Sequence, residues 1–177
     1  MKAVFDTNIW LSAIFWSGEA NKLIEKAESG NIELIITKEI LNEMIDVLNK
    51  ESKFQRFLEN RQKKTEDIIR TILSFSTLIK SKIKLNVIKE HQKDNIILEA
   101  AIDGKADYII SYDNHILNML EFREIKILSP QEFLRMLWPA DICQSRKKRE
   151  KPDKKEKTDR KKEKEDKAEN QTNSAPQ

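Results

Sequence analysis

Four acidic residues, far apart in the sequence, stand where predicted strands end or predicted helices begin. Asp6 and Asp113 each follow a short apolar run closely, Asp94 opens a helical pattern, and Glu43 lies one turn into another. In open α/β sheets, ligands bind beyond the carboxyl ends of the strands. We therefore expect these four carboxylates to converge on one edge of a sheet.

The elements that must position these acids alternate along the chain. Short β-branched runs between longer helical patterns predict βαβ units around a parallel sheet. The predicted strands cover residues 3–5, 34–36, 108–110 and 125–128, with a minor strand or only a connection within 77–88. The predicted helices follow the first strand and cover residues 20–29, 37–49 (with Thr37 as N-cap), 53–60, 65–75, the stretch between Asp94 and Gly104, 114–121 and 130–137.

Three of the acids also have a structural interpretation that involves no chemistry. Asp94 and Asp113 are favourable helix N-cap residues, and that alone would explain either one. Glu43 borders an apolar stripe and, like Glu39 and Asp46, fits the pattern of a solvated surface residue. The spacing leaves both interpretations open for these three acids.

Asp6 is harder to explain as a structural residue. It lies between the apolar runs 4–5 and 9–11, where burial is expected, and burial of an uncompensated charge is unfavourable. No lysine or arginine occurs between Lys2 and Lys22 to pair with it locally. The natural partner of this carboxylate is a cation from outside the chain.

A cluster of four carboxylates without basic neighbours would force one of them to take up a proton. A hard divalent ion removes that conflict, and all-oxygen ligands suit Mg²⁺ or Mn²⁺. Such an ion activates water and neutralises charge that develops on a phosphate. The residues therefore predict an acidic metal site for phosphoryl chemistry, and they leave open a hydrolase, a kinase-like transferase or a phosphatase.

Length and composition exclude several classes of protein. The chain has 177 residues, one cysteine and two histidines, so neither a disulfide framework nor a cysteine- or histidine-based metal site is expected. No run approaches the roughly 20 apolar residues of a membrane span. The opening residues also lack the pattern of a signal peptide. We expect a cytoplasmic protein without a membrane partner.

Charge divides the chain into a body and a tail. From Arg146 to Gln177 there are 13 basic and 8 acidic residues and almost no aliphatic side chains, whereas the rest of the chain has a net charge of −2. Such a segment buries too little apolar surface to offset the entropy lost on ordering. We predict one domain over residues 1–140 and a disordered, charged tail over residues 141–177.

Five segments resemble the motifs of the PIN-domain family, in the family's order. Residues 4–9 match its opening hydrophobic–Asp–Thr–Asn motif, and residues 39–43 and 93–101 match the helices of its second and third acids. Residues 106–113 match its alanine–aspartate–tyrosine block with the fourth acid, and residues 127–134 match its closing strand and helix. Each motif alone is weakly specific, but five in register resemble this family strongly, in particular its toxin–antitoxin members.

This resemblance implies a three-layer α/β/α sandwich with a mainly parallel sheet and a metal-dependent ribonuclease activity. Carried over residue by residue, the catalytic acids, which would hold Mg²⁺ or Mn²⁺, are Asp6, Glu43, Asp94 and Asp113. Asn8 and Ser111 would be polar supports at the pocket. Family members cleave single-stranded or exposed RNA, leaving a 3′-hydroxyl and a 5′-phosphate, and many form homodimers. A cognate antitoxin protein is the further partner implied.

Two positions depart from the family pattern. Close relatives often have Asp-Pro shortly before the third acid, where this chain has His91 and Gln92. They also commonly place an acid two positions after the fourth, where this chain has His115. Histidine binds Mg²⁺ less strongly than a carboxylate does. We expect both histidines to be solvated and the four acids to carry the chemistry.

Two other functions stay open at this point. A PIN-like module that binds RNA or protein with little turnover would use the fold as a scaffold, although the presence of all four acids argues against it. A structure-specific DNA nuclease would share the fold, but the chain lacks an inserted helical arch. Aromatic residues near the acids also have two interpretations. Trp10, Phe15 and Trp16 could stack bases, but for Trp10 and Phe15 packing of the first helix against the sheet is favoured.

Overall fold

Six strands form one sheet, in the order β3-β2-β1-β4-β6-β5, in the computed structural model, which describes residues 1–88 and 92–137. The parallel strands are β1 (Lys2–Phe5), β2 (Glu33–Thr37), β3 (Ser76–Ile79), β4 (Tyr108–Ile110) and β6 (Ile125–Leu128). The short strand β5 (Glu121–Phe122) pairs antiparallel with β6 at one edge. The predicted mainly parallel sheet is confirmed, and β3 is the minor strand that the sequence left open.

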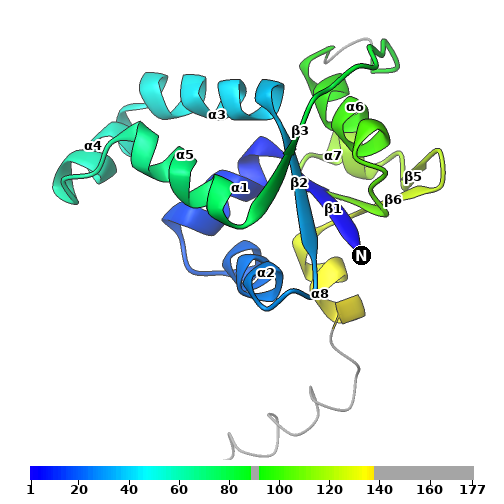
Figure 1. Ribbon diagram of the computed structural model, residues 1–177, viewed down its shortest axis with the longest axis horizontal. Helices are drawn as coiled ribbons and strands as arrows, with labels where there is room; N and C mark the ends of the chain where they lie inside the picture. The colour runs from blue at the N-terminus through cyan, green and yellow to red at the C-terminus, as the bar shows by residue number, and fades with distance from the viewer. Residues whose placement is uncertain (89–91, 138–177) are drawn as a thin grey trace, which may run out of the picture. The chain divides into compact units, whose positions relative to one another are not determined.

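Helices cover both faces of this sheet. They are α1 (Thr7–Phe15), α2 (Glu19–Glu28), α3 (Lys38–Lys50), α4 (Ser52–Asn60), α5 (Thr65–Ser74), the 3₁₀ turn η1 (Gln92–Asp94), α6 (Asn95–Asp103), α7 (Asn114–Leu117) and α8 (Pro130–Leu137). Figure 1 shows α6 on one side of the central strands and α1 and α2 on the other. The three-layer α/β/α architecture implied by the resemblance is therefore confirmed.

The central strands are buried on both faces, as parallel strands between two helical layers must be. The three apolar residues of β1, at positions 3–5, are fully buried. Residues 34–37 of β2 are almost completely buried as well. On α1, the Trp10 ring lies 5.3 Å from the Phe5 ring and stacks at 5.9 Å on Phe75. The prediction that Trp10 and Phe15 pack in the core is confirmed, because both side chains are buried.

Two helix ends follow directly from local chemistry. Thr37 caps α3 as predicted, because its Oγ1 accepts a hydrogen bond from the N–H of Ile40 at 3.4 Å. Gly104 ends α6 as predicted, and it does so in a crowded place. A Cβ atom at position 104 would lie 2.6 Å from Cγ2 of Ile35 on β2. The glycine therefore allows the close approach of α6 to the sheet.

The helix predicted over residues 114–121 is too long. Helix α7 ends at Leu117, and the chain enters β5 four residues later. Arg123 and Glu124 then connect β5 to β6 with φ angles of 48° and 67°. Two consecutive left-handed residues form the tight turn that matches the twist of an antiparallel pair. The sequence offers no glycine or asparagine at these two positions, so the usual hairpin signal is absent.

An extended segment, residues 80–88, follows β3 and is fixed by α6. Three polar side chains at four-residue spacing on α6 (Asn95, Glu99 and Asp103) accept hydrogen bonds at 2.6–3.0 Å. Their donors are the backbone N–H groups of Lys82, Ile83, Leu85, Val87 and Ile88. These bonds satisfy the backbone of a segment that belongs to no sheet. They also fix the start of α6, where Asp94 lies.

Some predictions fall on residues that the structure does not describe. The predicted charged tail (141–177) and His91 are among them. Within residues 1–88 and 92–137, no helix is long and apolar enough to cross a lipid bilayer.

Candidate active site

Asp6 lies at the carboxyl end of the central strand β1, where the chain turns into α1. Its backbone N–H donates to the carbonyl oxygen of Ile110 at 3.0 Å, so it sits beside the carboxyl end of the neighbouring strand β4. Only 8% of the residue is exposed. The side chain does not cap α1 by a hydrogen bond. A buried carboxylate at this edge is the placement that the sequence predicted for Asp6.

Ser111 connects Asp6 to Asp113. The buried Ser111 hydroxyl donates to Oδ2 of Asp6 at 2.8 Å, and its Oγ accepts the backbone N–H of Asp113 at 2.9 Å. Oδ1 of Asp113 accepts the N–H of His115 at 2.7 Å, which makes Asp113 the side-chain N-cap of α7. The capping interpretation of Asp113 is therefore confirmed, and the same residue is placed one hydroxyl away from Asp6.

Thr7 connects α1 to Glu43 on α3, and sequence reasoning missed it. Its Oγ1 donates to Oε2 of Glu43 at 2.7 Å, and Thr7 is itself buried. Glu43 is therefore half-buried and held toward the first turn of α1, not an ordinary solvated residue. The available signal was a hydroxyl residue directly after Asp6, on the first turn of a helix.

Glu43 and Asp94 act electrostatically on Asp6. The pKa of the Asp6 carboxyl rises from 3.8 to about 6, chiefly through burial and in addition through the negative charges of Glu43 and Asp94. Hydrogen bonds from Ser111 and from the backbone of Thr7 oppose the rise in this pKa. Among the residues that the structure describes, no lysine or arginine forms an ion pair with Asp6, Glu43 or Asp113. The structure thus brings together carboxylates that repel one another.

Asp94 stands at the N-cap position of α6 without capping it. Its backbone is in the helical region, with φ −68° and ψ −18°, and its side chain makes no hydrogen bond to the N–H groups of the first turn. Its Oδ2 atom is buried. The expected capping of α6 by the Asp94 side chain is therefore wrong.

A divalent cation fits the chemistry of these donors. The side chains whose negative charges repel one another here are carboxylates, and carboxylate oxygens are the ligands that Mg²⁺ and Mn²⁺ favour. Within residues 1–88 and 92–137, no three Asp, Glu, His or Cys side chains are close enough to form a complete metal site. Mg²⁺ usually binds to one or two carboxylates and keeps several waters, so a site with few protein ligands suits it.

The remaining predicted residues lie around this group without joining it. Asn8 is exposed on the first turn of α1, and His115 is exposed as predicted. Asp46 is exposed and pairs with Lys50 at 2.8 Å, which confirms it as a surface residue. Glu39 is not a solvated surface residue, because its Oε2 atom is buried and accepts no hydrogen bond from any described residue.

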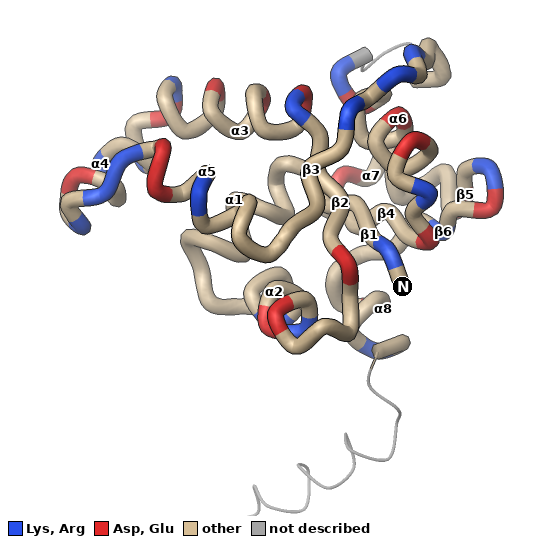
Figure 2. Tube along the Cα trace, in the orientation of Figure 1, with Lys and Arg blue, Asp and Glu red and all other residues tan. Residues whose placement is uncertain are grey.

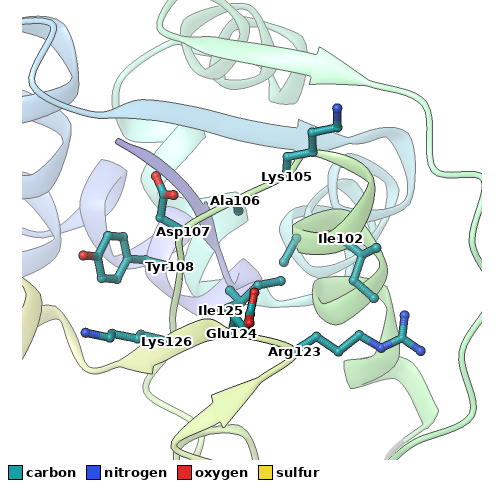
Figure 3. Close-up of a pocket in the computed structure, with 10 residues that line it drawn as sticks. Ile102, Lys105, Ala106, Asp107, Tyr108, Arg123, Glu124, Ile125 and Lys126 are labelled. Carbon is teal, nitrogen blue, oxygen red and sulfur yellow. The ribbon is translucent and has the colours of Figure 1, made fainter.

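A cavity of about 480 Å³ lies at the opposite edge of the sheet, near the amino ends of β4 and β6. None of the predicted site residues lines it. It contains three basic side chains, Lys105, Arg123 and Lys126, which Figure 3 shows pointing in different directions. The carboxylate of Asp107 in the same wall already accepts the backbone N–H of Lys2 at 2.7 Å. These groups do not converge on a ligand, so the acidic edge is the better candidate.

Comparisons with known proteins identify the family and the fold of the chain. A family model described as "PIN domain" matches residues 2–115, which is more than half of the chain. A crystal structure of VapBC2 from Rickettsia felis, bound to a DNA fragment from their promoter, is similar with a TM-score of 0.51. The two chains are 18% identical, and the match covers 73% of this chain and 98% of that one. At this identity the likeness concerns the fold. No curated protein sequence matches the chain.

Proposed function

Because this chain belongs to the PIN domain family, whose members are generally nucleases, we propose that it is a metal-dependent endoribonuclease. It hydrolyses RNA phosphodiester bonds and acts as the toxin of a toxin–antitoxin pair. The observation that supports this most is the burial of Asp6 beside the charges of Glu43 and Asp94, at the carboxyl edge of the sheet. This edge is where α/β folds bind their ligands.

The residues have separate roles in this proposal. Asp6, Glu43, Asp94 and Asp113 would hold Mg²⁺ or Mn²⁺ between them, with one or two carboxylates bound directly and water completing the coordination. When bound, such an ion supplies an activated water and neutralises charge on the phosphate. Ser111 orients the Asp6 carboxylate through its hydrogen bond to Oδ2, and Thr7 does the same for Glu43. Asn8 is a further polar support at the rim, where an exposed amide can reach the substrate.

The partners follow from the family and from the similar structure. VapBC2 is a toxin–antitoxin complex, which supports a cognate antitoxin as a protein partner of this chain. RNA is the substrate, and a homodimer is the assembly we expect. Expression of the wild-type chain should arrest growth of a bacterial host, and the Asp6→Asn variant at equal expression should not. Equal arrest by both would contradict the catalytic basis of toxicity.

Substrate class and product ends test the reaction itself. A single-stranded RNA, the same sequence as single-stranded DNA, and a fully paired RNA are each incubated with the protein and Mg²⁺. We expect cleavage of the single-stranded RNA alone, with 3′-hydroxyl and 5′-phosphate ends. Preferred cleavage of DNA would favour a DNA nuclease. Tight RNA binding without any product would favour a binding module that uses the fold as a scaffold.

A further inference from the structure

An aromatic cluster with one exposed member lies at the opposite end of α1 from Asp6. Trp16 follows the last residue of α1 and is 51% exposed, although it is among the largest apolar side chains. Its ring centroid lies 6.0 Å from that of Phe15 and 5.8 Å from that of Phe54, and both of these residues are buried. One side of the indole therefore packs against buried phenylalanines, and about half of the residue is exposed to solvent.

Basic side chains lie over two phenylalanine rings of this cluster, Phe54 and Phe57. The guanidinium carbon of Arg61 lies 4.3 Å from the Phe57 ring centroid, and Nζ of Lys53 lies 4.8 Å from the Phe54 ring centroid. The segment from residue 51 to residue 64 holds five basic and two acidic residues, although the body of the chain is slightly acidic. Figure 2 shows these basic positions along α4 and the turn that follows it.

We propose that Trp16, with Arg61 and Lys53 over the neighbouring rings of Phe57 and Phe54, forms a stacking platform for a base of single-stranded RNA. This inference rests on the proposed function, because it assigns a binding surface to the same substrate. Single-stranded nucleic acid is bound where aromatic rings stack bases and neighbouring cations contact the backbone. Trp16 offers the ring and Arg61 offers a cation. Lys53 offers a second cation, whose exposed ion pair with Glu51 at 2.7 Å a phosphate would replace.

The spacing suits a substrate that also reaches the acids. Trp16 lies ten positions after Asp6, and the nine residues of α1 between them make the separation about 15 Å along the helix axis. A stacked strand rises about 3.4 Å per nucleotide, so the base on Trp16 is roughly four nucleotides from the phosphate at the acids. The platform therefore contributes to the binding of an oligonucleotide and not of a dinucleotide.

A protein partner fits this surface less well. The cores of protein interfaces are depleted in charged residues, since the charges must be desolvated there. A protein that covered Trp16 together with the neighbouring rings of Phe54 and Phe57 would also bury the ammonium of Lys53 and the guanidinium of Arg61. RNA instead supplies phosphates, which can pair with Arg61 and can take the place of Glu51 beside Lys53.

Binding without cleavage tests the platform directly. The full chain with Asp6→Asn, in EDTA, is titrated into a fluorescently labelled single-stranded RNA, and binding is followed by anisotropy. Adding Trp16→Ala should weaken binding about tenfold, since stacking on one aromatic side chain contributes on that scale. Trp16→Phe should keep most of the affinity. Leu78→Ala is the matched control, because Leu78 is 52% exposed but lies on β3.

Abasic RNA separates stacking from charge. Oligonucleotides that lack one base at successive positions are bound by the protein with Trp16 intact and by its Trp16→Ala variant. We expect one abasic position to weaken binding to the protein with Trp16 and to leave binding to the Trp16→Ala variant unchanged. Equal affinity of both proteins for intact RNA would overturn the platform. A loss of protein-partner binding, with RNA binding intact, would assign this face to a protein and also overturn it.

The platform and the proposed reaction can fail independently. In the cleaving protein, Trp16→Ala should raise KM for an oligonucleotide about tenfold and leave kcat and dinucleotide cleavage unchanged. Cleavage by the wild type with no effect of Trp16→Ala would contradict the platform alone. Trp16-dependent binding with no cleavage of any RNA by the wild type would contradict the proposed function and not the platform.

Discussion

Asp6 makes the folded protein sensitive to pH in the absence of metal. Its pKa is about 6 in the folded state and 3.8 as a reference value, so the folded state binds this proton more tightly than the unfolded state does. The free energy of unfolding therefore falls as the pH rises from about 4 to about 6, by roughly 3 kcal/mol. Asp6→Asn should remove this fall and raise the melting temperature at pH 7 in EDTA.

Thermal melts across this pH range, with EDTA and with Mg²⁺, check the prediction. Mg²⁺ should stabilise the wild type more than Asp6→Asn, because it binds the folded site preferentially. Asp46→Asn is the control, since Asp46 is exposed and its carboxylate pairs with Lys50. If Asp6→Asn melts below the wild type in EDTA at pH 7, Asp6 is a structural residue.

Thr7 provides a second test at a single residue. Thr7→Val keeps the shape of the side chain but removes the donor to Oε2 of Glu43. We expect a loss of about 1 kcal/mol in stability, because a hydrogen bond to a half-buried charge is lost. We also expect cleavage about tenfold slower, since Glu43 is no longer held. Thr7→Ser keeps the hydroxyl and should retain the rate, and equal rates for the two variants would contradict this role.

The sequence predicted the positions of the acids better than their contacts. Hydrophobic periodicity predicts where strands end and helices begin, and Asp6, Asp94 and Asp113 stand at such positions. The contact between Thr7 and Glu43 joins α1 to α3 across 36 positions and has no local signature. Likewise, an N-cap preference could not reveal that Asp94 leaves its helix uncapped by its side chain.

At the scale of the elements, the contact between α6 and β2 limits the size of the side chain that position 104 can accommodate. Its φ is ordinary for any residue, so the restriction comes from space: a Cβ would lie 2.6 Å from Cγ2 of Ile35 and 2.9 Å from the carbonyl oxygen of Ala100. Gly104→Ala should therefore destabilise the protein by about 2 kcal/mol, through displacement of α6 from the sheet.

Chemical denaturation of two glycine variants checks this effect. Gly18→Ala is the matched control, because Gly18 has an extended φ of 175° and a Cβ added there would have no atom within 4 Å. It should lower the free energy of unfolding by only about 0.5 kcal/mol, because alanine is a poorer N-cap residue than glycine. Equal effects of the two substitutions would show that α6 packs loosely on β2.

Elements were predictable where burial dictates the pattern. The strands at 34–36 and 108–110 are continuous apolar runs because both faces of the sheet are covered, and Gly104 marks the end of α6. The turn at Arg123 and Glu124 was not predictable, since its left-handed conformation is imposed by the pairing of β5 with β6 and not by the residue types.

For the whole molecule, charge is divided between an acidic body and a basic tail. The tail from Arg146 to Gln177 has a net charge of +5 in the sequence, with acids interspersed among its lysines. Deletion of the tail should lower RNA affinity at low salt by a modest factor and leave the cleavage sites unchanged, because phosphate contacts are sensitive to salt and not to sequence. Binding at several salt concentrations and mapping of the cut sites measure both. Altered cut sites would contradict a non-specific role.

The most direct test of the central claim is the rate of RNA cleavage as a function of Mg²⁺ for the wild type and for Asp6→Asn. Single-turnover measurements on one single-stranded RNA, at fixed pH and with EDTA as the zero point, give both rates. We expect no cleavage by the wild type in EDTA, saturating cleavage as Mg²⁺ is added, and no cleavage by Asp6→Asn at any Mg²⁺ concentration. Undiminished cleavage in excess EDTA, or cleavage that survives Asp6→Asn, would contradict a metal-dependent reaction at this acidic edge.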